Sequence, residues 1–373
     1  MIYLYYSDRF QAYNFGPEHP FNPARLMLAY KLMEESGLID DRTCRAEAPP
    51  ASEADLQRVH TLEYIAAVQA EEPELAYGLG SDDTPVFPGI YEASRLLAGS
   101  SIDAARRIAA EGCSAFNLGG GLHHAMPSMA SGFCVFDDPA LAISVLEEHF
   151  ERILYIDIDG HHGDGVQQIF YEDPNVLTIS MHESGLYLFP GTGFIDELGS
   201  GRGLGYSINI PMPMYAGDEE YRRAFEDVVP PLFEWFSPQV VVAQLGVDTH
   251  YTDPLTTLNM TLTGYTYLVQ RIIDLSSRYT GGRLLALGGG GYNMEVVPVA
   301  WTSALTLMRG EKLMEYLSPY WVELFVNLVG REPLTPPDIE IKVGPETLKR
   351  ITAELDRTLD ALKEKVNGIH KIY

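Results

Sequence analysis

Cysteine is scarce in this chain of 373 residues, which has only Cys44, Cys113 and Cys134. The three are far apart in the sequence, and none belongs to a CxxC pair. This pattern excludes a disulfide framework and a zinc site built from cysteines, because both require paired thiols. It is typical of a reducing compartment, and we expect the protein to be cytoplasmic.

Long apolar segments are also missing. The N-terminal sequence MIYLYYSDRF has neither a basic region nor a long apolar region, so it predicts no signal peptide. No stretch reaches the roughly 18 consecutive apolar residues that a transmembrane helix requires. We therefore expect no membrane-spanning segment.

Positive charge is in short supply. The chain has 26 Lys and Arg against 52 Asp and Glu, a formal net charge of −26. This balance argues against nucleic acid as a direct ligand, because phosphate backbones attract Lys and Arg, and it would repel an anionic membrane surface. The ordinary consequence of such a charge is solubility, and the more specific one is attraction of cationic substrates.

Material for a packed core is plentiful, since 46% of the residues are hydrophobic and 11% are aromatic. Short β-rich apolar runs alternate with amphipathic stretches, and runs that are apolar at nearly every position are typical of strands buried on both faces of a parallel sheet. The predicted strands are Ser114–Leu118, Ile153–Ile158, Val176–Ser180, Tyr206–Ile210, Val240–Leu245 and Leu284–Leu287. The predicted helices are Ile90–Ala110, Pro139–His149, Asp218–Phe236, Gly264–Tyr279 and Val296–Arg309.

This alternation predicts an α/β fold with right-handed crossovers. The proline-rich stretch Glu332–Asp338 separates a last predicted helix, Pro345–Val366, from the rest. We therefore expect one catalytic domain over residues 1–330. Residues 331–373 would be a connector and a C-terminal helix that packs on or beside that domain.

Polar clusters follow several predicted strands at their carboxyl ends, where open α/β sheets bind ligands. Asp159 and His161 lie two residues apart after one strand, so their side chains can point the same way. Asp248 follows another buried run. Two carboxylates and one imidazole leave an open position on a divalent metal, as a catalytic site requires.

Each of these features has a simpler explanation when it is taken alone. A histidine pair such as His123–His124 usually occupies a loop or a core, and a D-x-D sequence often caps a turn. The combination is more specific, because imidazoles and carboxylates recur at one edge of one predicted sheet.

Two glycine runs, Gly119–Gly121 and Gly288–Gly291, also follow predicted strands. Neither matches a phosphate-binding GxxxxGK[ST] sequence, and neither has a lysine nearby. The second run is better explained by a close backbone approach that places Tyr292, whose phenol can donate to a developing oxyanion. A buried tyrosine at the start of a helix is the alternative for Tyr292 alone.

The motifs GGGLHHA, ASGFC, DIDGHHGDGVQ, FPGTG, QLGVD and LGGGGY occur in an order and spacing that resemble the zinc-dependent histone deacetylase family. The stretch DTPVFPGIYEA is most similar to its bacterial acetoin-utilisation, or AcuC-type, branch. The resemblance extends from about Gly16 to about Gly310. It implies an arginase/deacetylase fold, in which a central eight-stranded parallel sheet lies between helical layers.

The resemblance also implies an activity, the hydrolysis of acetyl or other short acyl groups from protein lysine side chains. It implies Zn²⁺ as the cofactor, with Fe²⁺ or Mn²⁺ as alternatives, held by Asp159, His161 and Asp248. His123 and His124 would be the tandem imidazoles, oriented by Asp157 and Asp164 respectively, and Tyr292 would stabilise the transition state.

Further positions follow from the same resemblance. Gly132, Phe133 and Phe189 would wall a narrow channel with Leu255 near its rim, and Arg25 would line an internal cavity beneath the metal. Asp83 would bind substrate backbone at the rim, with Asp82 as a competing choice. K⁺ or Na⁺ would bind at one site made by Asp157, Asp159, His161, Ser180 and Met181, and at a second made by Phe170, Asp173, Val176 and Tyr206.

Three residues depart from the family pattern: Gly160 between two metal ligands, Leu188 in place of an aromatic residue, and Asp137 in place of Asn. These departures affect the expected substrate preference rather than the capacity for catalysis.

The expected partner is an acylated lysine protein or a cationic small amide. The alternatives are an acetylpolyamine or other small-amide deacetylase, and a metal-free module that binds acyl-lysine. A dinuclear arginase-like site is disfavoured because the sequence offers one Asp/His/Asp set. The oligomeric state is not predicted.

Overall fold

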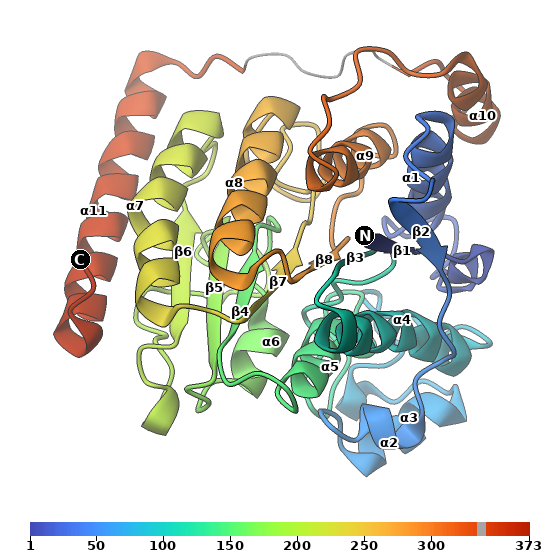
Figure 1. Cartoon of the computed structure of the whole chain (residues 1–373), viewed down its shortest axis with the longest axis horizontal. Coiled ribbons are helices and arrows are strands. Elements are labelled where there is room, and N and C mark those ends of the chain that lie inside the picture. The colour runs from blue at the N-terminus through green and yellow to red at the C-terminus, as the bar shows by residue number, and fades with distance from the viewer. Residues whose placement is uncertain (334–340) are drawn as a thin grey trace.

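A computed structural model describes residues 1–333 and 341–373 of the chain. In this structure an eight-stranded sheet lies between two layers of helices (Figure 1). The strands are β1 (Ile2–Tyr5), β2 (Thr43–Ala46), β3 (Ser114–Asn117), β4 (Ile153–Asp157), β5 (Val176–Glu183), β6 (Ser207–Met212), β7 (Val240–Gln244) and β8 (Leu284–Leu287).

The strand order is β2-β1-β3-β8-β7-β4-β5-β6, and every neighbouring pair is parallel. Strands β4, β5, β7 and β8 are buried at every position, as the largely apolar runs in their sequences predict. All six predicted strands are confirmed, although β5 continues to Glu183. The apolar pattern did not identify β1 and β2, which have four residues each; β2 lies at an edge and is partly exposed.

One helical layer covers each face of the sheet (Figure 1). The first comprises α2 (Glu53–Leu56), α3 (Leu62–Ala70), α4 (Ile90–Glu111), α5 (Asp138–Leu146) and α6 (Asp164–Ile169). The second comprises α1 (Ala24–Glu35), α7 (Asp218–Phe236), α8 (Leu262–Thr280), α9 (Val296–Met308), α10 (Pro319–Val329) and α11 (Pro345–His370). Short 3-10 turns occur at η1 (Asp8–Ala12), η2 (Leu75–Tyr77) and η3 (Gly201–Gly203).

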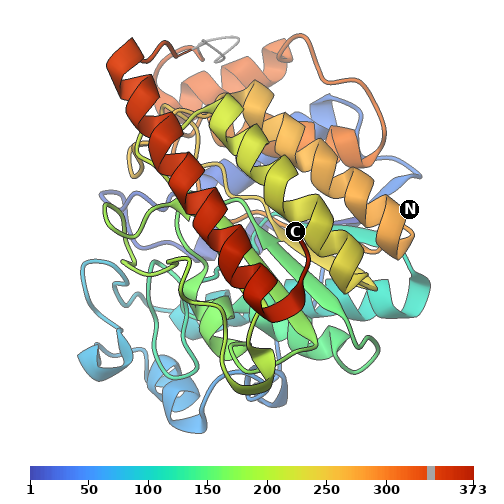
Figure 2. The ribbon, with the colours of Figure 1, turned by 90° about the vertical axis from the view of Figure 1, so that its left-hand side faces the viewer.

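The C-terminal helix α11 packs against α7 and the edge strand β6, as the side view shows (Figure 2). Its apolar residues recur every three or four positions and bury one face of the helix in the main core. These residues are Ile351, Leu355, Leu359, Leu362 and Val366. The helix extends to His370, four residues beyond the predicted end. Of the proline-rich stretch Glu332–Asp338, only Glu332 and Pro333 lie within the described residues.

The strand order explains how distant motifs meet. The loops after β3, β8, β7 and β4 carry the first glycine run with the histidine pair, Tyr292, Asp248 and the Asp159–His161 segment. These four strands are consecutive neighbours in the sheet, so their carboxyl ends lie side by side. Within the described residues, no helix is both long and apolar enough to cross a membrane.

Candidate active site

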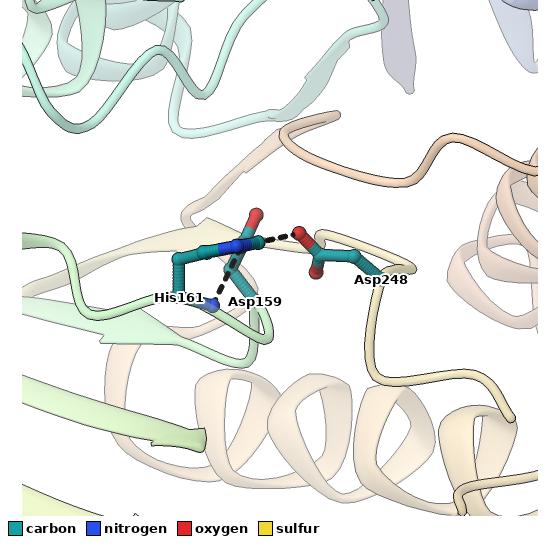
Figure 3. A group of neighbouring side chains, drawn as sticks. All are labelled: Asp159, His161 and Asp248. Carbon is teal, nitrogen blue, oxygen red and sulfur yellow. Dashed lines mark hydrogen bonds and ion pairs between the residues drawn. The ribbon is translucent and has the colours of Figure 1, made fainter. Parts of the chain in front are cut away.

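Asp159, His161 and Asp248 converge at the carboxyl edge of the sheet (Figure 3). One potential ligand atom from each residue lies within 4.8 Å of the others, and all three residues are buried. His161 Nδ1 is 2.9 Å from Asp248 Oδ2 and 3.3 Å from Asp159 Oδ1. Two buried carboxylates and an imidazole nitrogen at such distances fit a divalent cation with a position left open.

The remaining carboxylate oxygens are held by other groups. Asp159 Oδ2 accepts hydrogen bonds from Gln244 Nε2 at 2.6 Å and from Gly290 N at 2.8 Å. Asp248 Oδ1 accepts a hydrogen bond from Gly160 N at 2.6 Å. These bonds orient Asp159 Oδ1 and Asp248 Oδ2 toward His161, as outer partners of a metal site should.

The electrostatics of this group favour a bound cation. Burial lowers the pKa of His161, but hydrogen bonds and charges from Asp159 and Asp248 outweigh it and hold that pKa well above its usual value. Burial, together with the charge of Asp159, raises the pKa of Asp248 to about 6. The negative potential that draws a proton to His161 equally draws a metal ion, which would displace that proton.

The two histidines that follow the first glycine run lie side by side, each with its own carboxylate. His123 Nδ1 is 2.7 Å from Asp157 Oδ2, and His124 Nδ1 is 2.6 Å from Asp164 Oδ1. Asp157 Oδ2 also accepts a hydrogen bond from the Tyr155 hydroxyl at 2.6 Å. Each carboxylate holds a proton on the Nδ1 of its imidazole, so each Nε2 is directed away from its carboxylate.

The two imidazoles differ in charge. Burial lowers the pKa of His123, yet Asp157 and Asp159 more than offset this and raise it to about 10. Burial and the adjacent positive charge of His123 lower the pKa of His124, although Asp164 opposes them. His124 is therefore the neutral member of the pair near pH 7, and its unprotonated Nε2 lies 3.0 Å from His123 Nε2.

Tyr292 lies at the inner end of the channel described below and follows the second glycine run. A Cβ atom on Gly290 would lie 2.3 Å from Asp248 Oδ2, so this position requires glycine for the loop to approach the carboxylates. Asp253 Oδ2 accepts a hydrogen bond from Tyr292 N at 2.8 Å. Burial, with added repulsion from Asp248 and Asp159, holds the pKa of the Tyr292 phenol well above its usual value, so the hydroxyl stays a donor.

A channel of about 240 Å³ leads from the surface to this group of residues. It is lined by Asp83, His124, Gly132, Phe133, His161, Leu188, Phe189, Leu255 and Tyr292. The Phe189 ring lies edge-on to His124 at 5.1 Å, and the Phe133 ring lies edge-on to Tyr292 at 5.7 Å. All the residues expected to line the channel are therefore together, and a long unbranched apolar group matches its walls.

The acidic residues at the rim occupy different positions. Asp83 lines the channel, but its Oδ2 accepts a hydrogen bond from Gly132 N at 2.8 Å. Asp82 is exposed and is not among the residues that line the channel. A Cβ atom on Gly132 would lie 2.3 Å from the His124 ring, so the segment that Asp83 holds packs directly against His124.

Arg25 is buried behind the site. Its Nη1 donates to Gly291 O at 2.6 Å, and its guanidinium lies 4.4 Å from the Phe21 ring centroid and 5.7 Å from that of Tyr292. Burial lowers the pKa of Arg25 from its usual value, while the charges of Tyr292, Asp248, Asp159 and Asp253 act in the opposite direction.

The positions expected to bind monovalent cations form two groups. In the first, β4 and β5 pair Asp157 with Ser180, and Asp159 and His161 follow β4. Ser180 Oγ lies 2.8 Å from His182 Nδ1, and because His182 Nε2 is 3.0 Å from Gly193 O, the Ser180 hydroxyl is the donor in its pair. The second group lies around the start of β5, where Thr178 N donates to Tyr206 O and Asp173 N donates to Phe170 O.

The structure shows which groups surround Gly160 and Asp137, two of the three residues that depart from the family pattern. A Cβ atom on Gly160 would lie 2.7 Å from Thr256 Cγ2, so the Thr256 methyl group occupies the space that a larger residue would need. Asp137 Oδ1 caps α5 through Ala140 N, whereas its buried Oδ2 has no hydrogen-bond partner within the described structure. Burial raises the pKa of Asp137 well above its usual value.

Sequence reasoning missed three residues that support the site: Gln244, Asp253 and Asp138. Asp138 accepts hydrogen bonds from Gly121 N and Leu122 N and so supports the loop before the histidine pair. A polar residue at the end of a buried strand was the available signal for Gln244, and an Asp in a motif loop was the signal for Asp253. Neither signal says which atom the side chain contacts.

The fold and this constellation together define an α/β protein with a candidate divalent-metal centre at the base of a narrow channel. A model of the histone deacetylase domain matches residues 19–308, and the chain therefore belongs to the histone deacetylase family. It is 44% identical over 328 residues to the acetoin utilization protein AcuC of Bacillus subtilis (strain 168), covering 85% of this chain and 84% of that protein.

Solved structures agree with this assignment. The crystal structure of an HDAC homologue from Aquifex aeolicus superposes with a TM-score of 0.83 at 31% sequence identity, covering 96% of this chain and 99% of that one. A structure of an HDAC homologue complexed with SAHA matches with the same TM-score, identity and coverage. The predicted family and the arginase/deacetylase fold are confirmed, and the chain is a deacetylase of this family.

Proposed function

We propose that this protein is a zinc-dependent deacetylase that removes acetyl groups from lysine side chains of proteins. The observation that carries the proposal is the channel, whose apolar walls lead to Tyr292, His124 and His161 at its inner end. An acyl-lysine has the matching shape, since four methylene groups end in an amide. Fe²⁺ or Mn²⁺ would also suit the donor set, and K⁺ or Na⁺ would serve as structural ions.

Asp159, His161 and Asp248 would hold the divalent ion. When bound, this ion supplies Lewis acidity, which polarises the amide carbonyl and lowers the pKa of a nearby water molecule. The Asp159 and Asp248 carboxylates are already oriented for this role by Gln244 and Gly160, so binding requires little rearrangement.

His124 acts as the general base in this proposal. In this step His124 exchanges its Nε2 contact with His123 for the attacking water. The neutral imidazole takes the water proton on Nε2, while Asp164 stabilises the resulting charge through Nδ1. The water oxygen bonds to the carbonyl carbon, and the C–N bond then breaks as His124 returns the proton to the leaving amine. The products are a lysine ammonium group and acetate, with one water consumed.

Tyr292 and His123 stabilise charge in the same step. The Tyr292 hydroxyl donates to the carbonyl oxygen as negative charge develops there, which its raised pKa permits across the working pH range. His123 remains protonated against Asp157 and acts electrostatically. Phe133 and Phe189 exclude water from the stem of the substrate.

The test is hydrolysis of acetyl-lysine peptides by enzyme loaded separately with Zn²⁺, Fe²⁺ and Mn²⁺, with the released amine as the readout. We expect metal-dependent turnover that is lost in Tyr292→Phe. Absence of metal-dependent hydrolysis across an acyl-lysine panel would refute the proposal and favour a binding module.

A small-amide deacetylase is the second candidate, because the net charge of −26 suits a cationic polyamine as well as a lysine-rich protein. Comparison of kcat/KM for acetylated spermidine and for acetyl-lysine peptides separates the two functions.

We also propose a reducing compartment such as the cytoplasm, because Cys44, Cys113 and Cys134 are all free thiols.

A further inference from the structure

Glu183 is a buried carboxylate near the candidate metal ligands that has no part in the proposed mechanism. It is the last residue of β5 and is only 1% exposed. Within the described part of the chain its carboxylate has no ion-pair partner, and both of its hydrogen bonds go to Thr257. A carboxylate buried without a cation is destabilising unless hydrogen bonds replace the lost water, so this contact with Thr257 needs an explanation.

The Glu183 carboxylate holds Thr257 at two points. Its Oε2 accepts a hydrogen bond from Thr257 N at 2.8 Å, and its Oε1 accepts one from Thr257 Oγ1 at 2.5 Å. Hydrogen bonds to a charged acceptor are stronger than those between neutral groups, and a pair of them fixes orientation as well as position. Both the main chain and the side chain of Thr257 are therefore fixed relative to the end of β5.

The residue before Thr257 contacts a candidate metal ligand. Thr256 Oγ1 donates to the main-chain oxygen of Asp248 at 2.5 Å. The Thr256 methyl group packs against Gly160, where a Cβ atom would lie only 2.7 Å from it. Asp248 lies in the connection between β7 and α8, residues 245–261, which contains no helix or strand. Its position therefore depends on side-chain contacts of this kind rather than on a regular element.

These contacts close a ring of hydrogen bonds behind the metal site. Gly160 N donates to Asp248 Oδ1 at 2.6 Å, and Glu183 N donates to Gly160 O at 3.0 Å. The ring runs from the Glu183 carboxylate through Thr257 and Thr256 to Asp248 and returns through Gly160 to the Glu183 main chain. Because Gly160 belongs to the segment that carries the other two ligands, the ring joins all parts of the chain that carry ligands (Figure 3).

We propose that Glu183 is a positioning residue for the metal site and that it acts on Asp248 through the Thr256–Thr257 segment. This inference rests on the ligand set of the proposed function. The same segment continues into Leu255, which lines the channel. Glu183 thereby holds one ligand and one channel residue in a fixed relation. Groups that orient a ligand in this way typically change metal affinity by about 10- to 100-fold when they are removed.

The test is the Zn²⁺ affinity of Glu183 variants, measured by competition with a chelator, which requires no turnover. Glu183→Ala removes both acceptors, and we expect the affinity to fall by about 10-fold or more. Glu183→Gln can accept from Thr257 N and donate to Thr257 Oγ1, so it should retain an affinity close to that of the wild type. An affinity of Glu183→Gln as low as that of Glu183→Ala would overturn a role that acts through contact geometry.

Substitutions of Thr256 test the second step of the chain of contacts. Thr256→Val keeps the shape of the side chain and loses only the hydroxyl that contacts Asp248, so affinity should fall by about 10-fold. Thr256→Ser keeps that hydroxyl and should bind Zn²⁺ as the wild type does. The matched control is Thr266→Val on α8, where the lost hydroxyl also donates to a main-chain oxygen, that of Leu262 at 2.8 Å. It should leave the affinity unchanged.

Hydrogen exchange of the metal-free protein gives a reading that is independent of the ion. The Thr257 amide should exchange about 10-fold or more faster in Glu183→Ala than in the wild type, as expected for loss of a hydrogen bond to a charged group. In Glu183→Gln the rate should stay near the wild-type value. Equal exchange in all three proteins would contradict the hold of Glu183 on this segment.

The outcomes separate this inference from the proposed function. Wild-type Zn²⁺ affinity in both Glu183→Ala and Thr256→Val would overturn the positioning role and leave the ligand set intact. Unchanged metal content in Asp248→Ala would instead refute the ligand set on which the inference rests. If Glu183→Ala does not fold, Thr256→Val decides the question, because it preserves the volume of the side chain.

Discussion

His123 and His124 place their Nε2 atoms 3.0 Å apart, while each Nδ1 contacts a different aspartate. The raised pKa of His123, about 10, makes it the proton donor in this contact and leaves His124 as the acceptor. Two chemically identical side chains that are adjacent in the sequence thus take different charges. The difference arises because Asp157 and Asp159 act on one imidazole, whereas the other faces the positive charge of its neighbour.

Substitution of Asp164 by Asn should move the acid limb of the pH profile. In the wild-type enzyme, burial and His123 lower the pKa of His124, while Asp164 opposes them. Removing the Asp164 charge lowers the pKa of His124 further, so the acid limb of kcat/KM should shift to lower pH. The plateau should also fall, because the protonated base loses its partner. The control is Asp227→Asn, at a partly buried ion pair with Lys363. An unshifted acid limb in Asp164→Asn would exclude His124 as the base.

Tyr292→Phe should lower kcat by about 100-fold or more, because one oxyanion donor is typically worth about 2.7 to 4 kcal/mol. Metal content should remain at the wild-type level, because the phenol is not one of the clustered ligand groups. Steady-state kinetics and elemental analysis of the same preparation check both statements. Tyr267→Phe removes a hydroxyl that contacts Glu226 on the surface and should not change kcat. Near-normal turnover in Tyr292→Phe would rule out the donor role.

Asp248→Ala should abolish metal binding. The substitution removes one of three ligands and leaves His161 with Asp159 as its remaining carboxylate contact. Elemental analysis of the purified variant after incubation with Zn²⁺ should show loss of the ion, with activity lost in parallel. Asp274→Ala, at a half-exposed carboxylate, should retain the metal. Unchanged metal content in Asp248→Ala would show that the ligand assignment is wrong.

Gln244→Ala should weaken metal affinity by about 10- to 100-fold, the usual cost of losing a group that orients a ligand. Gln244 donates to Asp159 Oδ2 at 2.6 Å and accepts from Gly246 N at 2.7 Å, so its removal frees both the ligand and the adjacent loop. Competition with a chelator of known affinity measures the change. Gln270→Ala on the exposed face of α8 is the matched control. A Gln244→Ala enzyme with wild-type affinity would contradict this positioning role.

Much of the fold could be predicted from the chain alone. Strands β4 and β7 are apolar at every position except the last, Asp157 and Gln244, and such runs are typical of strands buried on both faces, so local sequence defines them. Strand β2 was not predicted, because it is not buried on both faces and has no apolar run. It lies at the sheet edge with Arg45 exposed, and its short sequence TCRA carries no apolar signal. Helix α10 also went unrecognised, although Trp321 and Phe325 pack against Leu28 and Leu32 of α1.

The residue types of the candidate site could be predicted from the chain alone, because Asp159 and His161 lie within one short motif and Tyr292 directly follows the glycine run. Only the tertiary structure decided which groups orient them. Gln244 and Asp159 are 85 residues apart and meet because β7 and β4 are neighbours in the sheet. The tertiary structure likewise turned the Asp83 carboxylate toward Gly132 N and brought Phe21 and Arg25 behind Tyr292. Such contacts depend on strand order and packing, which bring together side chains that no local pattern connects.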